Sequence, residues 1–492
     1  MKGFDNDLYV KKQTERILER IESFDNKLYL EFGGKLFDDL HAARVLPGFD
    51  PNAKAKILQR LKDKAEVIFC VSAQDIVRNK IRADYGITYG MEVLRVIDSL
   101  RGYGLYVSSI VITQYEDQVG AEMFRQRLMR RGESVYLHRL TKGYPLDVDT
   151  IVSDSGYGSN PFIPTTRPLV VVTAPGPGTG KLATCLSQLY HEYKHGGKAG
   201  YAKFETFPIW NLDLKHPVNV AYEAATADLL DVNMIDHFHL AAYGVTSVNY
   251  NRDLETFPLV KSILDRILGR ELYLSPTDMG VNMVADAIIN DEVCRNAAKQ
   301  EVIRRYYQAC VDYKKGIGST ETVHRLEFLM KQLGLSPTDR LTVAAALEKE
   351  KSTGLPAVAI QLDEKTIVTG KQSPLMTASS AAILNALKVF AKMDDKIKLL
   401  PPQVIEPILQ LNSNLYHSKS EMMTLEQTLV ALTVSRAYNP EAGVALAQLS
   451  KLRGAQAHSS HILTHTDSSI FRVLGMDLTS ESTFISDDLY TD

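Results

Sequence analysis

One loop in the sequence combines residue types that could bind an anion. Residues 168–181 read Pro-Leu-Val-Val-Val-Thr-Ala-Pro-Gly-Pro-Gly-Thr-Gly-Lys, an apolar run followed by a turn with Gly176, Gly178 and Gly180. Glycines allow several backbone N–H groups to point into one small volume, because no Cβ obstructs them. A helix that begins at Lys181 adds unpaired N–H donors, the positive end of its dipole and a full charge. The pattern predicts a binding site for phosphate or a similar anion.

This loop is similar to a Walker A phosphate-binding loop, with departures. That motif has Gly, four residues, and then Gly-Lys followed by Ser or Thr. Here Pro175 stands at the first position and Leu182 follows Lys181, so the hydroxyl that binds Mg²⁺ is missing from its usual place. Thr179 and Thr184 are the nearest substitutes. A tight strand-to-helix turn, with glycines that serve packing alone, is the structural alternative.

The reaction that such a loop favours is phosphoryl transfer or hydrolysis. Backbone N–H groups from Gly178 to Lys181 would hold the phosphate, together with Gly176 and Thr179, and Lys181 would neutralise developing charge. Asp154 and Glu31 are the candidates to position Mg²⁺ or a nucleophile. The cofactor expected on this interpretation is a nucleotide, with Mg²⁺.

A second glycine turn follows an earlier apolar run. Gly33, Gly34 and Lys35 come directly after residues 28–32 and are followed by a segment rich in charged side chains. We expect these three residues to form a second contact with phosphate or carboxylate at the carboxyl edge of a sheet. A turn with a solvated charged helix behind it is the alternative.

Two groups of histidines are candidates for a metal site. His237 and His239 are predicted on one face of a strand, whereas His458, His461 and His465 have the spacing of a helical stripe. No recognised ligand spacing accompanies either group, and the motifs of zinc peptidases and serine hydrolases are absent. We therefore predict structural roles and no metal site, and keep a metal-dependent hydrolase as an alternative.

The elements that must position these residues alternate between strands and helices. Continuous apolar runs near 28–32, 67–71, 107–113, 134–140, 168–173 and 200–204, and a probable strand at 238–242, are separated by segments with helical periodicity. Continuous apolar strands are typical of a parallel sheet covered on both faces. The sequence therefore predicts a doubly wound, mainly parallel α/β sheet with a P-loop-like strand–loop–helix.

The pattern changes in the second half of the chain. Residues 272–352 carry helical periodicity, and a predicted hairpin at 357–370 is followed by helices. We expect a doubly wound α/β domain at 1–271, a helical subdomain at 272–352 and a small C-terminal α/β domain at 353–492. The alanine-rich segment 377–393 favours a homodimer.

Composition restricts the partners and the compartment. The 492 residues carry 56 basic and 59 acidic side chains, a balance that gives no reason to expect nucleic acid. No stretch of eighteen apolar residues occurs, so no membrane span is expected. Four cysteines without CxxC spacing, and an N-terminus without a signal-peptide pattern, favour the cytoplasm.

Three stretches resemble one bacterial family. They are residues 28–48, the loop 173–181 with 183–191 after it, and residues 454–461 (Gly-Ala-Gln-Ala-His-Ser-Ser-His). The chain resembles, over essentially its whole length, the domain-of-unknown-function family eighteen-forty-six. The resemblance implies a bacterial cytoplasmic protein with an α/β part, a helical part and a small C-terminal α/β part. It implies no activity and no catalytic residues.

The function hypothesis therefore rests on the glycine loop. It is a protein that binds a phosphate-bearing small molecule or nucleotide at residues 176–181, with phosphoryl transfer or hydrolysis as the reaction. The rival hypothesis is a non-catalytic ligand-binding or scaffold protein that forms oligomers.

Overall fold

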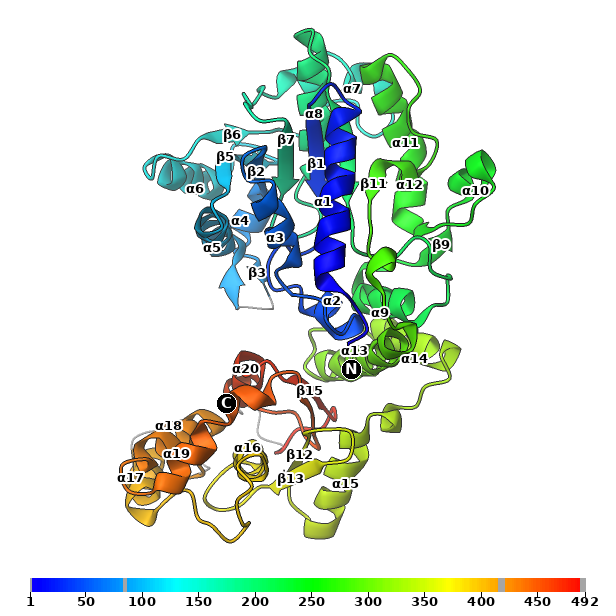
Figure 1. Ribbon diagram of the computed structural model, residues 1–492. Coiled ribbons are helices and arrows are strands. Elements are labelled where there is room, and N and C mark those ends of the chain that lie inside the picture. Colours follow the sequence, from blue (N-terminus) through cyan, green and yellow to red (C-terminus); the bar gives the residue numbers. More distant parts are fainter. Residues whose placement is uncertain (1, 83–85, 415–420, 487–492) are drawn as a thin grey trace. The chain divides into compact units, whose positions relative to one another are not determined.

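The computed structural model describes residues 2–82, 86–414 and 421–486 (Figure 1). The chain divides into two compact units, Met1–Ala298 and Lys299–Asp492. Each unit is built around its own β-sheet. In the described part of the chain, no helix is long and apolar enough to cross a bilayer.

The first unit contains a seven-stranded sheet in which all neighbouring strands run parallel. The strand order is β11-β8-β1-β7-β2-β5-β6. This confirms the predicted doubly wound parallel sheet. The strands of this sheet are β1 Leu28–Phe32, β2 Ala65–Ser72, β5 Tyr106–Thr113, β6 Val135–Leu137, β7 Leu169–Thr173, β8 Gly200–Phe204 and β11 Gly280–Val281.

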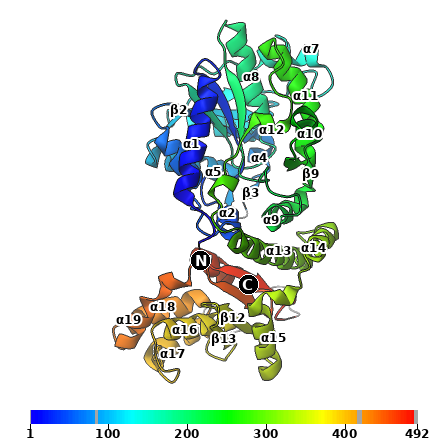
Figure 2. The same cartoon turned by 45° about the vertical axis from the view of Figure 1, so that its right-hand side comes forward.

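Burial explains why these segments form strands. Every residue of β2 and β7 is buried, as expected for central strands with helices on both faces. Figure 1 shows α1 and α3 on one face of the sheet, and in Figure 2 α8 and α11 lie on the side of the sheet away from α1. The helices of this unit are α1 Asn6–Glu22, α2 Leu40–Val45, α3 Ala53–Arg60, α4 Ala73–Val77, α5 Tyr89–Gly102, α6 Val119–Met129, α7 Val148–Ile151, α8 Lys181–Lys194, α9 Pro217–Ala225, α10 His237–Tyr243, α11 Asn251–Leu268 and α12 Pro276–Met279.

The order of the strands creates a switch point in the middle of the sheet. The chain leaves β1 toward β2 on one side, and it leaves β7 toward β8 on the other. Right-handed crossovers in opposite directions must lie on opposite faces of the sheet. The carboxyl ends of β1 and β7 therefore border the position at which open α/β folds form their ligand-binding crevice.

Two smaller hairpins extend this unit, and one expected strand proves to be a helix. β9 Asn233–Ile235 pairs antiparallel with β10 Val248–Tyr250, and β3 Ile81–Arg82 pairs with β4 Ile87–Thr88. The strand predicted at 238–242 is wrong, because those residues belong to α10. The Asp236 carboxylate accepts a hydrogen bond from the His239 N–H and caps that helix at its start.

The second unit contains a four-stranded sheet with the order β13-β12-β14-β15. β12 pairs antiparallel with β13 and β14, while β14 and β15 are parallel. The predicted hairpin and the small C-terminal α/β architecture are confirmed. The elements of this part are β12 Ala357–Gln361, β13 Ile367–Lys371, β14 Gln456–Ser459, β15 Asp477–Ser480, α14 Thr320–Gln332, α15 Leu341–Thr353, α16 Ala378–Phe390, α17 Pro402–Asn414, α18 Leu425–Ser435, α19 Pro440–Leu446 and α20 His465–Val473.

The boundary between the two compact units falls within one helix. Helix α13, Asp291–Lys314, contains both Ala298 and Lys299. The segment 272–352 is largely helical, but it also contains the short strand β11 of the large sheet. The division at residues 271 and 352 stays a prediction.

Close packing between a strand and a helix in the second unit gives a test of its core. A Cβ on Gly370, in β13, would lie 2.1 Å from the backbone nitrogen of Ala382 in α16. We expect Gly370→Ala to lower the free energy of unfolding of this unit by about 1–3 kcal/mol, because α16 must move away from the sheet. Urea unfolding followed by circular dichroism measures the change.

Gly443→Ala is the matched control. Gly443 lies inside α19, and a Cβ there would meet no atom closer than 3.7 Å. It should leave stability unchanged or raise it slightly, since alanine favours a helix. Equal destabilisation by both substitutions would contradict the packing argument.

Candidate functional site

The structure places the two predicted glycine segments next to each other. Gly33 and Gly34 follow β1, and the loop 174–180 follows β7. β1 and β7 are neighbours in the sheet, with Glu31 opposite Val172. Because adjacent strands lie about 4.8 Å apart, both segments leave the sheet side by side at its switch point.

The three glycines of loop 174–180 are explained by different features of the structure. Gly178 and Gly180 have φ of 71° and 78°, a left-handed conformation that costs little only for glycine. A Cβ on Gly176 would instead lie 2.6 Å from the hydroxyl oxygen of Tyr89. Backbone conformation therefore selects two of the glycines, whereas a Cβ on the third would require the Tyr89 ring to shift.

Hydrogen bonds within the protein hold the carbonyl groups of this loop. Thr113 Oγ1 donates to the Thr179 oxygen at 2.8 Å, and Gln114 Nε2 donates to the Gly178 oxygen at 3.2 Å. The buried hydroxyl of Thr179 donates to the Gly176 oxygen at 3.0 Å. Hydrogen bonds to the backbone carbonyl oxygens of Gly176, Gly178 and Thr179 therefore hold the loop in place.

The start of α8 presents donors without a protein cap. Gly180 is the N-cap residue, and as a glycine it has no side chain that could cap this helix. The first turn contains no acidic residue, and Lys181 is its first residue. The first N–H groups of a helix have no partners within the helix and carry partial positive charge. This helix end is therefore electropositive.

Lys181 and Glu31 both influence one buried thiol on the α8 side of the sheet. Both act on the thiol of Cys70, which is buried beside Thr184. Burial raises the pKa of Cys70 to about 12; Lys181 opposes the shift and Glu31 adds to it. Both charges therefore lie within electrostatic reach of one thiol, which supports their placement in one site.

Charged residues at the end of β8 extend this site. Lys203 Nζ lies 2.5 Å from a Glu205 oxygen and 2.8 Å from an Asp253 oxygen, and the Tyr201 hydroxyl donates to Glu31 at 2.7 Å. Because Glu31 and Lys203 are register partners, their side chains share one face of the sheet. We name Glu31, Lys203, Glu205 and Asp253 the β8 cluster.

Electrostatics favour the charged form of Lys203 within the β8 cluster. Burial alone lowers the pKa of this lysine, but the carboxylates of Asp253, Glu205 and Glu31 outweigh burial and raise it. The pKa of Glu205 is also raised, because burial and the neighbouring carboxylates outweigh Lys203. The Glu205 side chain is 8% exposed, compared with 25% for Lys203. Sequence reasoning missed Lys203, Glu205 and Asp253, although polar residues alternate at 201, 203 and 205.

The segment after β1 contains a buried ion pair. Lys54 Nζ lies 2.9 Å from an Asp39 oxygen, and the Lys54 side chain is 2% exposed. Gly34 has φ of 69°, and a Cβ there would lie 3.0 Å from Lys54 Nζ. A Cβ on Gly33 would lie 2.8 Å from the Phe204 carbonyl oxygen. Lys35 is half-buried in the same segment. Gly33 is therefore required by the approach of β8, and this turn has a structural role whatever it binds.

Asp154 lies at the other end of α8. Its carboxylate accepts hydrogen bonds from Tyr190, at 2.6 Å, and from Lys194. Helix α8 has 14 residues, which at 1.5 Å per residue separates its two ends by about 20 Å. The structure does not bring Asp154 together with Lys181.

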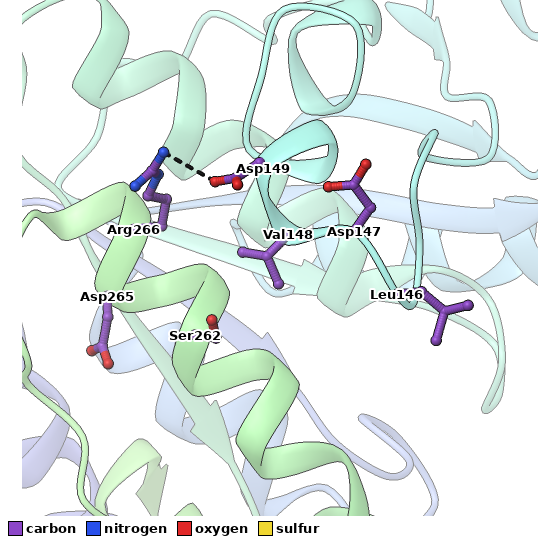
Figure 3. Close-up of a pocket in the computed structure, with 7 residues that line it drawn as sticks. All are labelled: Leu146, Asp147, Val148, Asp149, Ser262, Asp265 and Arg266. Atoms are coloured by element: carbon purple, nitrogen blue, oxygen red, sulfur yellow. Dashed lines mark ion pairs between the residues drawn. The ribbon is translucent and has the colours of Figure 1, made fainter.

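A hollow of about 650 Å³ also lies at that distant, amino end of the sheet. Figure 3 shows its lining, in which α7 and α11 face each other and Asp149 pairs with Arg266 at 3.0 Å. It is open and polar, and none of the residues predicted for the anion site lines it. A second hollow of about 460 Å³ lies beside α3 and α5 and includes Asp38 and Asn52.

The histidine clusters differ from their predicted arrangement. His237 and His239 lie on a helix, and His239 Nδ1 lies 2.9 Å from the Ser275 hydroxyl. His458 lies in strand β14, whereas His465 begins α20, so these residues do not form one helical stripe. Among the described residues, no group of three or more His, Cys, Asp or Glu side chains is arranged to hold a metal ion.

Fold and site together define the class of this protein. It is an α/β protein with a central parallel sheet and a glycine-rich strand–loop–helix at the switch point of that sheet. Two family models match the chain, "Domain of unknown function DUF1846, N-terminal" over residues 2–334 and the corresponding C-terminal domain over residues 338–490. The chain belongs to the DUF1846 family.

Its curated relatives are bacterial proteins of similar length. The UPF0371 protein of Clostridium botulinum strain Langeland is 54% identical over 497 residues, and that of Clostridium tetani strain Massachusetts is 55% identical over 497 residues. A UPF0371 protein of Fusobacterium nucleatum is 55% identical over 501 residues. Each comparison covers 99% of both chains.

The packing of Gly180 gives a test of the loop. A Cβ there would lie 3.0 Å from the Thr113 side chain, in addition to the strain of a positive φ. We expect Gly180→Ala to lower stability by about 1–2 kcal/mol and to speed amide hydrogen exchange in residues 176–182, because the bond from Thr113 is disturbed.

Gly196→Ala is the control at the other end of α8. Gly196 has a similar φ of 80°, but a Cβ there would meet nothing within 4 Å. The loss of stability in Gly196→Ala should therefore reflect only the strain of placing alanine at a positive φ. If its effects on stability and on exchange in the loop equal those of Gly180→Ala, the contact with Thr113 is not important.

Proposed function

We propose that this protein binds a phosphate ester at the carboxyl edge of the large sheet, between β1 and β7. Backbone N–H groups of Gly178, Thr179, Gly180 and Lys181 would donate to the phosphate oxygens. The Lys181 ammonium group would supply the balancing charge. Gly33 and Gly34 would border the other side of the ligand.

One observation carries this proposal: the acceptors of the loop are satisfied within the protein, while the donors at the start of α8 have no side-chain cap. Lys181 Nζ lies 3.3 Å from the Gly176 carbonyl oxygen, so its ammonium group is held over the loop. A structural turn has no need of a lysine beside an uncapped helix start, where positive charge is unfavourable. An anion at this position would remove that unfavourable interaction.

Binding is favoured over transfer of a phosphoryl group from a Mg²⁺–nucleotide. The hydroxyl of Thr179 donates to Gly176, and that of Thr184 donates to the Gly180 oxygen at 2.9 Å. Both hydroxyls that could replace the missing Mg²⁺ ligand thus point back to the backbone of the loop, and the Thr184 oxygen also accepts from the buried Cys70 thiol. Asp154, one of the two carboxylates predicted to position Mg²⁺, lies at the far end of α8, and the other, Glu31, is bonded by the Tyr201 hydroxyl. These contacts favour recognition of the phosphate by backbone and lysine alone.

Hydrolysis of the bound ester is a second candidate function, and Glu31 favours it. This carboxylate is held by the Tyr201 hydroxyl and shares the Cys70 environment with Lys181. A carboxylate beside a bound phosphate can accept a proton from an attacking water molecule.

The lysine gives the direct test of binding. A charge-assisted contact is worth about 1.5–3 kcal/mol, so Lys181→Ala should raise the Kd for inorganic phosphate by about one to two orders of magnitude. Isothermal titration calorimetry on the full chain measures it. Lys194→Ala, at the other end of the same helix, is the matched control and should leave the Kd unchanged. Wild-type protein that binds no phosphate at millimolar concentration would refute the proposal.

Glu31→Gln tests the hydrolytic candidate. Release of inorganic phosphate from a panel of phosphate esters should fall by about 10²-fold or more in this variant, because a positioned general base contributes that much. Binding of inorganic phosphate should persist. Turnover that is equal in wild type and Glu31→Gln, or absent from both, would leave binding as the function of the site.

A further inference from the structure

We infer that the ligand is a phosphate monoester of a polyol, such as a sugar phosphate, with its hydroxyl groups bound by the β8 cluster and Tyr250. This inference rests on the proposed phosphate site and adds the chemistry of the rest of the ligand.

The spacing of the strands sets the size of this ligand. β7, β1 and β8 are consecutive in the sheet, so the loop after β7 and Glu205 after β8 are two strand spacings apart. That separation is about 10 Å, close to the length of a phosphorylated five- or six-carbon sugar. Glu31 lies on the strand between them and has Lys203 as its register partner. A ligand of this length would therefore pass over Glu31 on the way from Lys181 to Glu205.

Tyr250 provides an independent indication that the cluster binds something. Its side chain is 5% exposed, and its hydroxyl has no hydrogen-bond partner among the described residues. A buried hydroxyl without a partner is unfavourable, so such groups in native proteins are usually satisfied by water or a ligand. Tyr250 is the N-cap residue of α11, and Asp253 of the cluster lies in the first turn of the same helix. Burial, then Tyr222 and the carboxylates of Asp231, Glu205 and Asp253, raise the pKa of Tyr250, which agrees with this position. Its ring stacks on Tyr222 with centroids 5.7 Å apart, so its orientation is fixed.

The charges of the cluster select the chemistry of the group bound there. Two carboxylates pair directly with Lys203, and Glu31 is its register partner on the neighbouring strand, so a second phosphate would be repelled. Carboxylates accept hydrogen bonds, and hydroxyl groups donate them. The tyrosine hydroxyl and Lys203 can donate to the same hydroxyl groups. A vicinal diol matches this mixture of acceptors and donors, whereas a purely apolar or anionic group does not.

Calorimetric titration of the full chain tests this inference with inorganic phosphate, ribose 5-phosphate and AMP. Wild-type protein should bind ribose 5-phosphate at least about tenfold more tightly than inorganic phosphate, because hydrogen bonds to charged groups are added. Glu205→Gln and Tyr250→Phe should remove most of this gain and leave the Kd for inorganic phosphate within about twofold. Tyr250→Phe should also keep or raise the melting temperature, since it removes a hydroxyl without a partner.

Matched controls and the nucleotide separate the outcomes. Tyr190→Phe and Asp149→Asn remove the same chemical groups at the opposite end of the unit and should change no Kd. AMP that binds like ribose 5-phosphate identifies the sugar phosphate as the bound part. The inference would be overturned if AMP bound tightly while ribose 5-phosphate bound no more tightly than inorganic phosphate. The protein would then recognise the base and not the sugar. Equal affinity for all three ligands would also overturn it, while phosphate binding stands. Failure to bind any of them refutes the proposed function itself.

Discussion

The insertion of β7 between β1 and β2 is the constraint on which the site depends. β7 pairs with β1 over residues 169–172 and with β2 over residues 169–173, and its loop must therefore leave the sheet between the ends of those two strands. That position is crowded, with Tyr89 against Gly176 and Thr113 against Gly180. Side chains at these positions would displace the loop from its supports. Packing thus requires the same glycines that the proposed anion site would use, which explains how a glycine-rich loop can be rigid.

The two helices that begin at this edge on the α8 face differ in their electrostatics. Helix α11 has Asp253 in its first turn, a negative charge that complements the helix dipole, and Asp253 also pairs with Lys203. Helix α8 has no acidic residue in its first turn and begins with Lys181. The edge therefore has an electropositive part over β7 and an electronegative part over β8. A ligand with one anionic end and one hydroxyl-bearing end would be oriented by this difference.

Individual strands and helices could be predicted from the sequence, but which of them lie next to each other in the fold could not. Continuous apolar runs identified β2, β5, β7 and β8, and the glycines with Lys181 identified the start of α8 within one residue. Both glycine turns were found because each has a local signature. Their adjacency depends on strand order, which no local pattern encodes, and the β8 cluster was missed for the same reason. Asp253 is 50 residues from Lys203 along the chain. Asp154 was selected for its place after an apolar stretch, but tertiary contacts with Tyr190 and Lys194 hold it at the other end of α8.

The histidines show where local periodicity misleads. Residues 458, 461 and 465 have helical spacing, yet β14 ends at Ser459 and α20 begins at His465. Pairing of β14 with β12 and β15 on both sides outweighs any helical preference of this short segment.

The residues that depart from a Walker A loop are more informative than the histidines. Thr184 lies three residues beyond Lys181. Its hydroxyl donates a hydrogen bond to the Gly180 carbonyl oxygen and contacts the buried Cys70 thiol. A threonine turned inward toward the sheet cannot also coordinate a metal ion at the helix start. In the proposed site, the charge of a phosphate would then be met by backbone N–H groups, the dipole of α8 and Lys181, and these are the groups that the fold of this loop leaves available.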